Sequence, residues 1–233
     1  MEPIEETRAA LDLLTTQGDP EVGIALLRMG RMARQVAPAC VGLSLGLLDE
    51  ELTFTLVASS EEIAAFDAMQ YLDGGPCVDG AHDGKRVEVD IDDIAQQEEE
   101  WLMYAQATAA AGIRSSLTLP VVRSGRVIGT VNLYGATADA FTGRQDELAE
   151  ALGVAAGAAI TNADLTFATR LDAVEAPQRI LDQDDVDIAL GMIARSQNVD
   201  IPVAQERLRQ AAARAGITEG QAARAVRGVL IPD

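Results

Sequence analysis

The sequence predicts an α+β protein in which an antiparallel sheet flanked by helices precedes a small all-α unit of three helices. Strand and helix patterns alternate up to about residue 135, and no strand pattern follows. The charge divides in a similar way. Residues 1–165 hold 10 basic and 27 acidic side chains, net −17, whereas residues 166–233 hold 8 and 10, net −2. We therefore expect an N-terminal helical extension at 1–19, an α+β domain at 20–165 and a three-helix domain at 166–233.

The first elements of the α+β part are a helix and a hairpin. Residues 21–36 repeat apolar side chains at spacings of three and four, which is typical of a helix packed on a core. The runs "CVGLSLGLL" (40–48) and "LTFTLVAS" (52–59) predict two strands joined by the acidic turn "DEE". A loop through "LDGGPCVDG" is expected to follow.

The rest of this part adds one helix and three strands. "KRVEV" (85–89) indicates a short strand, and "EEEWLMYAQATAAAG" (98–112) a helix closed by its last glycine. "SSLTLPVV" (115–122) and "RVIGTVNLYG" (126–135) predict two strands turned by "RSG".

The remainder of the chain is expected to be helical. A long helix starts near residue 143, and Pro177 interrupts it. Three shorter helices follow, the first over 179–196. The second has Asp200 as N-cap and ends at Gly216, and the third opens with the capping box "TEGQ" (218–221).

Composition limits the class of protein. The chain has 233 residues, 48% of them hydrophobic, so it can bury a core despite a net charge of −19. It carries no uncharged apolar run of about 18 residues and no basic start of a secretory leader, so we expect a cytoplasmic protein without a membrane span. With only Cys40, Cys77 and His82, a zinc site or a histidine-based catalytic triad is not expected, and the thiols should be free.

A basic stretch interrupts this acidic chain. "ERLRQAAARAG" (206–216) lies within residues 195–227, where six arginines stand against three acids. They are either the solvated face of helices or contacts to nucleic acid phosphates. Arg207 and Arg214 share a helix face, and Arg209 lies about 200° from Arg207. The candidate RNA-binding residues are Arg195, Arg207, Arg209, Arg214, Arg224 and Arg227.

Two families resemble successive parts of the chain. Residues 20–165 resemble a GAF domain, a small-molecule sensing module, through "LDGGPCVDG", "AGIRSSLTLPVVRSGRVIGTVNLYG" and "AFTGRQDELAEALG". "VDIALGMIARSQNVDIPVAQERLRQAAARAGITEGQAARAV" resembles the ANTAR domain, a three-helix RNA-binding module of transcription antiterminators. Ile188 and Leu190 stand where that family usually has Gln and Lys, and Gln205 replaces a usual aromatic.

The GAF resemblance points to candidate ligand-binding residues. Cys77 begins the segment that lies near the ligand cavity in that family, although such a cysteine also serves as a small buried hydrophobe. Trp101 and Tyr104, three apart on an expected helix, either wall a pocket or pack on the sheet. Arg114 either meets an anion or is exposed. The candidates are Cys77, Trp101, Tyr104, Arg114, Ser116 and Tyr134. We expect no haem, bilin or metal.

Together the two resemblances imply a signal-responsive regulator that is not an enzyme. Its GAF part would bind a small molecule, and its helical part would bind an RNA hairpin to oppose transcription termination. A homodimer is expected because the alanine- and glycine-rich helix after residue 143 would allow close packing against a second copy. One alternative is a ligand-sensing or protein-interacting dimerisation module without RNA binding. Another is a thiol reductase with Cys77 as nucleophile.

Overall fold

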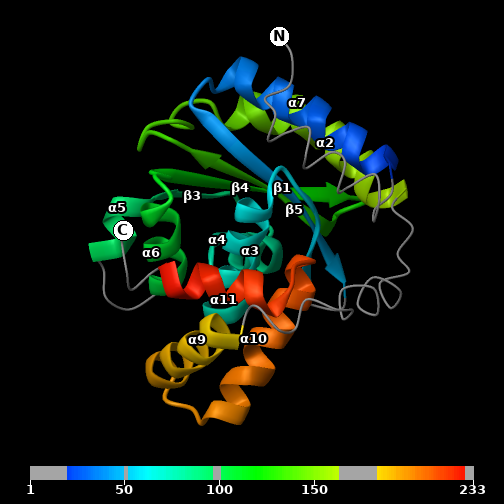
Figure 1. Ribbon diagram of the computed structural model, residues 1–233. Helices are drawn as coiled ribbons and strands as arrows, with labels where there is room; N and C mark the ends of the chain where they lie inside the picture. The colour runs from blue at the N-terminus through cyan, green and yellow to red at the C-terminus, as the bar shows by residue number, and fades with distance from the viewer. Residues whose placement is uncertain (1–19, 50–51, 97–100, 163–182, 229–233) are drawn as a thin grey trace.

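A five-stranded antiparallel sheet forms the centre of the molecule (Figure 1). The computed structural model describes residues 20–49, 52–96, 101–162 and 183–228. The strands are β1 (Cys40–Asp49), β2 (Leu52–Ala58), β3 (Val87–Asp90), β4 (Ser115–Arg123) and β5 (Arg126–Gly135). Their order is β2-β1-β5-β4-β3, and every neighbouring pair is antiparallel. The predicted sheet class and all five predicted strands are confirmed.

A tight turn connects β4 to the central strand β5. Arg123 pairs with Arg126 across the ladder, which leaves Ser124 and Gly125 as the turn. Their φ angles are 52° and 79°, as a two-residue type I′ hairpin requires. Glycine is suited to the second position because it lacks a Cβ. The turn predicted at "RSG" is confirmed.

The helices α2 (Pro20–Val36) and α7 (Gln145–Asn162) cover one face of the sheet and lie side by side there (Figure 1). Leucines and valines that alternate along the strands fill the layer beneath them, which excludes water from this face. The core of this layer includes Met29, Leu43, Leu45, Leu117, Leu119, Val131, Leu133, Leu148 and Leu152. The extension expected at 1–19, the end of the long helix after 162 and its break at Pro177 lie outside the described residues.

The opposite face is covered by two helices that the sequence analysis did not predict, α3 (Glu61–Asp73) and α4 (Pro76–Asp83). The expected loop at "LDGGPCVDG" is wrong: only Gly74 and Gly75 separate these helices, and Pro76 opens the second. Helix α3 gave no amphipathic pattern because its residues from 63 to 70 are all buried.

Two glycines let these helices approach the sheet closely. A Cβ on Gly42 of β1 would lie 2.4 Å from Cδ1 of Ile63 on α3. A Cβ on Gly80 of α4 would lie 2.6 Å from Cγ2 of Thr118 on β4. Side chains at either position would push the helix off the sheet, so the space between the layers is set by these contacts.

Of two further short helices, α6 (Leu102–Ala110) packs against α3, and α5 (Ile91–Gln96) packs against α6. The predicted helix at 98–112 is confirmed over Leu102–Ala110, with Gly112 at φ 77° just beyond its end, while residues 98–100 lie outside the described residues. Trp101, however, is not inside it. Its φ of 58° places it in the left-handed region immediately before the first helical residue, so it does not share a helix face with Tyr104.

The C-terminal helices are α9 (Gln183–Ser196), α10 (Ile201–Ala215) and α11 (Glu219–Gly228). Asp200 caps α10 by accepting a hydrogen bond from the Val203 amide at 3.1 Å. Gly216 ends α10 with φ 70°. Thr218 and Gln221 form a reciprocal capping box, with bonds of 3.1 and 2.7 Å. The three predicted helix boundaries are therefore confirmed.

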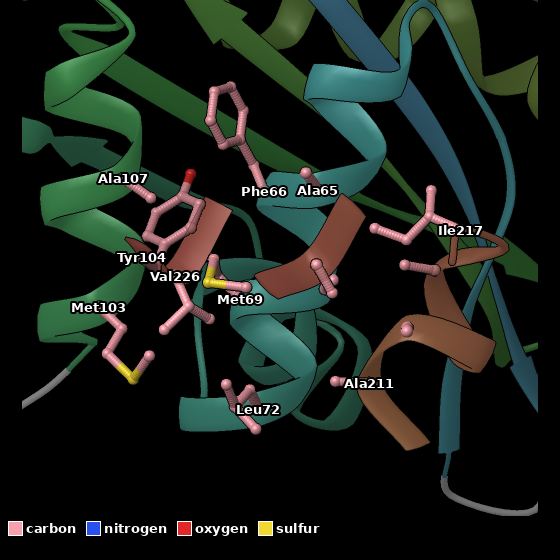
Figure 2. Close-up of a cluster of buried hydrophobic side chains, with 14 of the residues drawn as sticks. Ala65, Phe66, Met69, Leu72, Met103, Tyr104, Ala107, Ala211, Ile217 and Val226 are labelled. Carbon is pink, nitrogen blue, oxygen red and sulfur yellow. The ribbon is translucent and has the colours of Figure 1, made fainter. Parts of the chain in front are cut away.

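The C-terminal helices share a hydrophobic core with the α+β part. Leu208 and Ala211 of α10 and Val226 of α11 belong to the same buried cluster as Phe66 and Met69 of α3. Figure 2 shows side chains of α3, α6, α10 and α11 converging in this cluster. In the described part of the chain, the apolar faces of α9, α10 and α11 are thus buried in a core built jointly with α3 and α6.

Candidate functional site

A layer of polar side chains is enclosed between the sheet and the helices α3, α4 and α6. Along each strand the polar residues alternate with the leucines and valines of the outer core, so they occupy the opposite face. The strand residues, with Asp67 and Gln70, are at most 7% exposed although they are polar, and Tyr71 is partly buried. We call the following set the polar layer: Ser44, Thr53, Thr55, Ser116, Thr118, Thr130, Asn132 and Tyr134 from the strands, with Asp67, Gln70 and Tyr71 from α3.

The carboxylate of Asp67 is the charged centre of this layer. The Tyr134 hydroxyl donates to its Oδ1 at 2.7 Å, and the Thr55 hydroxyl donates to its Oδ2 at 2.9 Å. The Gln70 amide also donates to Oδ1, at 3.4 Å. Burial raises the pKa of Asp67 from 3.8 to about 6, and the hydrogen bonds oppose part of that rise. A buried carboxylate of this kind favours hydrogen-bond donors or a cation beside it.

Four buried hydroxyls nearby have no hydrogen-bond partner within the part of the chain that the structure describes. They belong to Thr53, Tyr104, Ser116 and Thr130. Ser116 lies close enough to oppose the rise in the Tyr104 pKa, which burial causes, but the two hydroxyls do not meet hydrogen-bond geometry. Since buried polar atoms in proteins are nearly always paired, these hydroxyls are suited to bind a small polar molecule or water.

Cys77 lies at the edge of the layer, at the start of α4. Its backbone amide donates to Oε1 of Gln70 at 2.8 Å, and its side chain is fully buried. Burial, followed by the charge of Asp67, raises the pKa of the thiol well above its ordinary value of 9.0. The reactive thiolate is therefore disfavoured, and Cys77 acts as a buried apolar side chain.

The structure brings four of the six candidate ligand residues together. Tyr134 is hydrogen-bonded within the polar layer, and burial together with the charge of Asp67 raises its pKa well above 10.0. Ser116 pairs with Tyr134 across β4 and β5. Cys77 and Tyr104 are near enough for their charges to raise the pKa of Tyr134 further.

The other two candidates lie outside the polar layer. Arg114 is exposed and forms an ion pair with Asp92, with N···O distances of 2.6 and 2.8 Å. This pair satisfies the guanidinium at the surface, so the suggestion that Arg114 meets an anion in the pocket is not supported. Trp101 lies against Gly74 at the end of α3 and packs on the hydrophobic cluster there. This position fits the alternative in which Trp101 is a packing residue.

Sequence analysis missed the helix that supplies the central carboxylate. Asp67, Gln70 and Tyr71 all belong to α3, which gave no periodic signal. One signal was present: Ser and Thr alternate with Leu and Val in "SSLTLPVV" and "LTFTLVA", which indicates a polar sheet face. A sheet face exposed to solvent and a polar sheet face covered by helices both give this alternation of polar and apolar residues. Only the position of α3 in the structure shows that the face is covered.

Arg214, a candidate RNA contact, is half-buried against β2 and α3 of the α+β part. Its Nε donates to the Thr53 carbonyl at 2.9 Å, and its Nη1 donates to the Tyr71 carbonyl at 3.4 Å. Its Cζ lies 4.3 Å from the centre of the Tyr71 ring, which is cation–π distance. Burial lowers the pKa of the Arg214 guanidinium below its ordinary value. The expectation that it faces outward is therefore corrected.

Arg207 and Arg214 share a face of α10 that is directed toward the C-terminal end of α3. Arg207 donates to Oε1 of Gln197, and Nε2 of the same glutamine donates to the Leu72 carbonyl at 3.0 Å. Arg209, on the other side of α10, pairs with Glu206 at 2.7 Å. That hydrogen bond is the main reason why the pKa of Glu206 falls to about 2.

The remaining candidate arginines are exposed. Arg195 lies at the end of α9, and Arg227 of α11 pairs with Asp185. Arg224 lies at a cleft of about 370 Å³ between α3, α6 and α11, which Glu61 and Glu62 also line. These side chains are accessible, and acids lie close to most of them.

The described residues contain no group of three or more His, Cys, Asp or Glu side chains that could hold a metal ion. None of their helices is both long enough and apolar enough to cross a membrane.

A five-stranded antiparallel sheet, with polar groups enclosed between one face and the helices α3, α4 and α6, places the chain in the α+β class. Residues 21–161 match the family model of the GAF domain, which is more than half of the chain. The chain therefore belongs to the GAF family, and a GAF sensor domain fits a role in sensing signals. None of the curated proteins matches it.

Several solved structures are distantly similar. The type II free methionine-R-sulfoxide reductase of Thermoplasma acidophilum is 13% identical, with a TM-score of 0.39 over 60% of this chain and 94% of its own. SdiA in complex with octanoyl-rac-glycerol is 14% identical, with a TM-score of 0.44 over 98% and 97%. The chromophore-binding domain of a bacteriophytochrome from R. palustris is 12% identical, with a TM-score of 0.34 over 67% and 58%.

Proposed function

We propose that this protein is a signal-responsive transcription regulator. In this proposal a small molecule binds in the polar layer of the GAF domain, and the C-terminal helices act as an RNA-binding antiterminator. The observation that carries the proposal is the core that α10 and α11 share with α3, because α3 also supplies Asp67. Helix α3 therefore contacts both the polar layer and the C-terminal helices, so a change in one can reach the other through it.

The chemistry of the polar layer favours a neutral or cationic ligand with hydrogen-bonding groups. Asp67 provides an acceptor, and the unpartnered hydroxyls of Thr53, Tyr104, Ser116 and Thr130 provide donors or acceptors. An anion would have to lie beside a buried carboxylate in a medium of low dielectric constant, which is costly. The proposal includes no metal, haem or bilin and no catalytic step.

Exposed arginines of the C-terminal helices support the RNA-binding part. Arg195, Arg209 and Arg224 are exposed on α9, α10 and α11. Phosphate contacts from arginine make affinity fall with salt, whereas the acidic remainder of the protein repels nonspecific RNA.

The test is a titration of the full-length protein against a pool of structured RNA hairpins over a series of salt concentrations. The variant replaces Arg195, Arg209 and Arg224 with alanine together. Its matched control replaces Arg28, Arg31 and Arg34, three exposed arginines on α2, and so removes the same charge. We expect the first triple variant to lose salt-dependent binding and the control to keep it. Equal loss in both, or no binding by the unsubstituted protein, would contradict the RNA-binding part.

The alternative function is a ligand sensor that binds a protein partner instead of RNA. One observation favours it: Leu190, where the ANTAR family usually has Lys, is 6% exposed and lies in the shared core. This position offers a buried apolar side chain in place of a cation. In the same titration, this alternative predicts no binding by any of the three proteins while their helices remain intact by circular dichroism.

We also propose that the regulator is a homodimer that associates through α7. Val154 of α7 is 84% exposed, and Ile24 on the adjacent α2 is 64% exposed. Gly153 and Ala158, both exposed, would let a second helix approach closely. Light scattering at micromolar concentration should give the mass of a dimer, and Val154→Asp should give a monomer. A monomeric unsubstituted protein would contradict the dimer.

A further inference from the structure

Arg214 lies where the C-terminal helices meet the polar layer. Its guanidinium is held by two backbone carbonyls, those of Thr53 on β2 and Tyr71 on α3, and it stacks on the ring of Tyr71. The first carbonyl and the phenol belong to residues of the polar layer.

A series of hydrogen bonds connects this arginine's binding site to Asp67. The Thr55 hydroxyl donates to Oδ2 of Asp67 at 2.9 Å, and it lies 2.9 Å from the Tyr71 hydroxyl. A hydroxyl has one proton to donate, so Thr55 must accept from Tyr71 while it donates to the carboxylate. The direction of both bonds is thus set by the charge on Asp67, and the phenol under Arg214 is oriented by it.

We propose that Arg214 is the residue through which the C-terminal helices respond to the state of the polar layer, by way of Tyr71, Thr55 and Asp67. A ligand that donates to Asp67 competes with Thr55 for the carboxylate. The released Thr55 hydroxyl turns toward another acceptor, and the Tyr71 phenol loses its partner or reverses its bond. The ring that Arg214 stacks on then shifts. This inference rests on the proposed sensor role of the polar layer.

A second contact between the two parts does not belong to this series and provides an internal control. Gln197, which follows α9, donates to the Leu72 carbonyl at the end of α3. It touches neither Thr55 nor Asp67. A coupling through Arg214 should leave the protection of α9 unchanged, whereas general loosening of the core would affect α9 as well as α10.

The experiment measures amide hydrogen exchange in the full-length protein with two substitutions of one residue. Thr55→Ser keeps the hydroxyl, and Thr55→Val removes it with little change in volume. Without denaturant, where amides exchange through local opening, we expect Thr55→Val to speed exchange in the part of α10 around Arg214 by about threefold or more relative to any change in α9. Thr55→Ser should exchange like the unsubstituted protein. Tyr71→Phe keeps the ring and removes only its hydroxyl, so it should also speed exchange in α10. If Thr55→Val does not fold, Tyr71→Phe is measured in its place.

Two results would overturn the proposal. One is equal exchange of α10 in the Ser and Val variants. The other is an equal increase, without denaturant, in the local exchange of α9, α10 and α11, because this would show a loosened core rather than a specific connection. Neither measurement uses RNA or a ligand, so failure of the RNA titration leaves this test intact, and failure here leaves the RNA-binding proposal standing.

Discussion

Asp67 is expected to make the stability of the folded protein depend on pH. Its folded pKa of about 6 lies above the ordinary 3.8, so the folded state holds the proton more tightly. The resulting stabilisation is fully present below the ordinary pKa and is lost as the pH rises through 6. A difference of about 2 pH units corresponds to about 3 kcal/mol in all, of which about 1 kcal/mol is lost between pH 5 and pH 7.

Neighbouring groups in the layer do not titrate in this range. Burial raises the pKa of Tyr71, Tyr134 and Cys77 well above their ordinary values, so all three stay neutral between pH 5 and pH 7. Arg214 stays charged there, although burial lowers its pKa. The change in stability within the layer is therefore assigned to Asp67 alone.

The assay is urea unfolding at pH 5, 6 and 7, followed by the fluorescence of Trp101, the one tryptophan of the chain. Asp67→Asn removes the titrating group, and Asp139→Asn, at an exposed aspartate, is the matched control. The unfolding free energy of the unsubstituted protein and of the control should fall by about 1 kcal/mol more than that of Asp67→Asn between pH 5 and pH 7. Parallel pH profiles for all three proteins would refute the reasoning.

Three further outcomes follow from the buried contacts. Leu208→Ala should lower the unfolding free energy by about 2 to 5 kcal/mol, because it leaves a cavity in the shared core, and a smaller loss would show that α10 is loosely packed. Neither cysteine should react with iodoacetamide at pH 7 in the native protein, because burial raises the pKa of Cys40 to about 11 and that of Cys77 well above 9.0. Labelling is measured by mass spectrometry, and rapid modification of either cysteine in the native protein would contradict the prediction. Thr130→Val should change stability little, because it removes an unpartnered hydroxyl, whereas Thr118→Val should destabilise because Thr118 donates to Asn132 at 3.3 Å. Equal urea midpoints for the two valine variants would contradict the assignment of these hydroxyls.

The sequence predicted the elements whose patterns depend on local chemistry. The turn at Ser124 and Gly125, the cap at Asp200 and the capping box at Thr218 were all found in place. Each of these signals is set by the backbone geometry of a few adjacent residues, so it survives whatever packs around it.

The sequence could not predict features that depend on packing between distant elements. Helix α3 is buried on all sides, which removes the polar face that marks an amphipathic helix. The polar sheet face gave the pattern of a solvated face, although helices cover it. Arg214 gave the pattern of an exposed arginine on α10, and only the approach of β2 and α3 turns it into a contact between the two parts.

The central claim is that the sensor and the C-terminal helices form one cooperative unit. Native-state hydrogen exchange of the full-length protein at increasing urea concentration tests it most directly. We predict that the most protected amides of α3, α10 and α11 open with the same free energy, because their side chains share one core. Opening of α10 and α11 at a much lower free energy, while α3 keeps its protection, would contradict the claim.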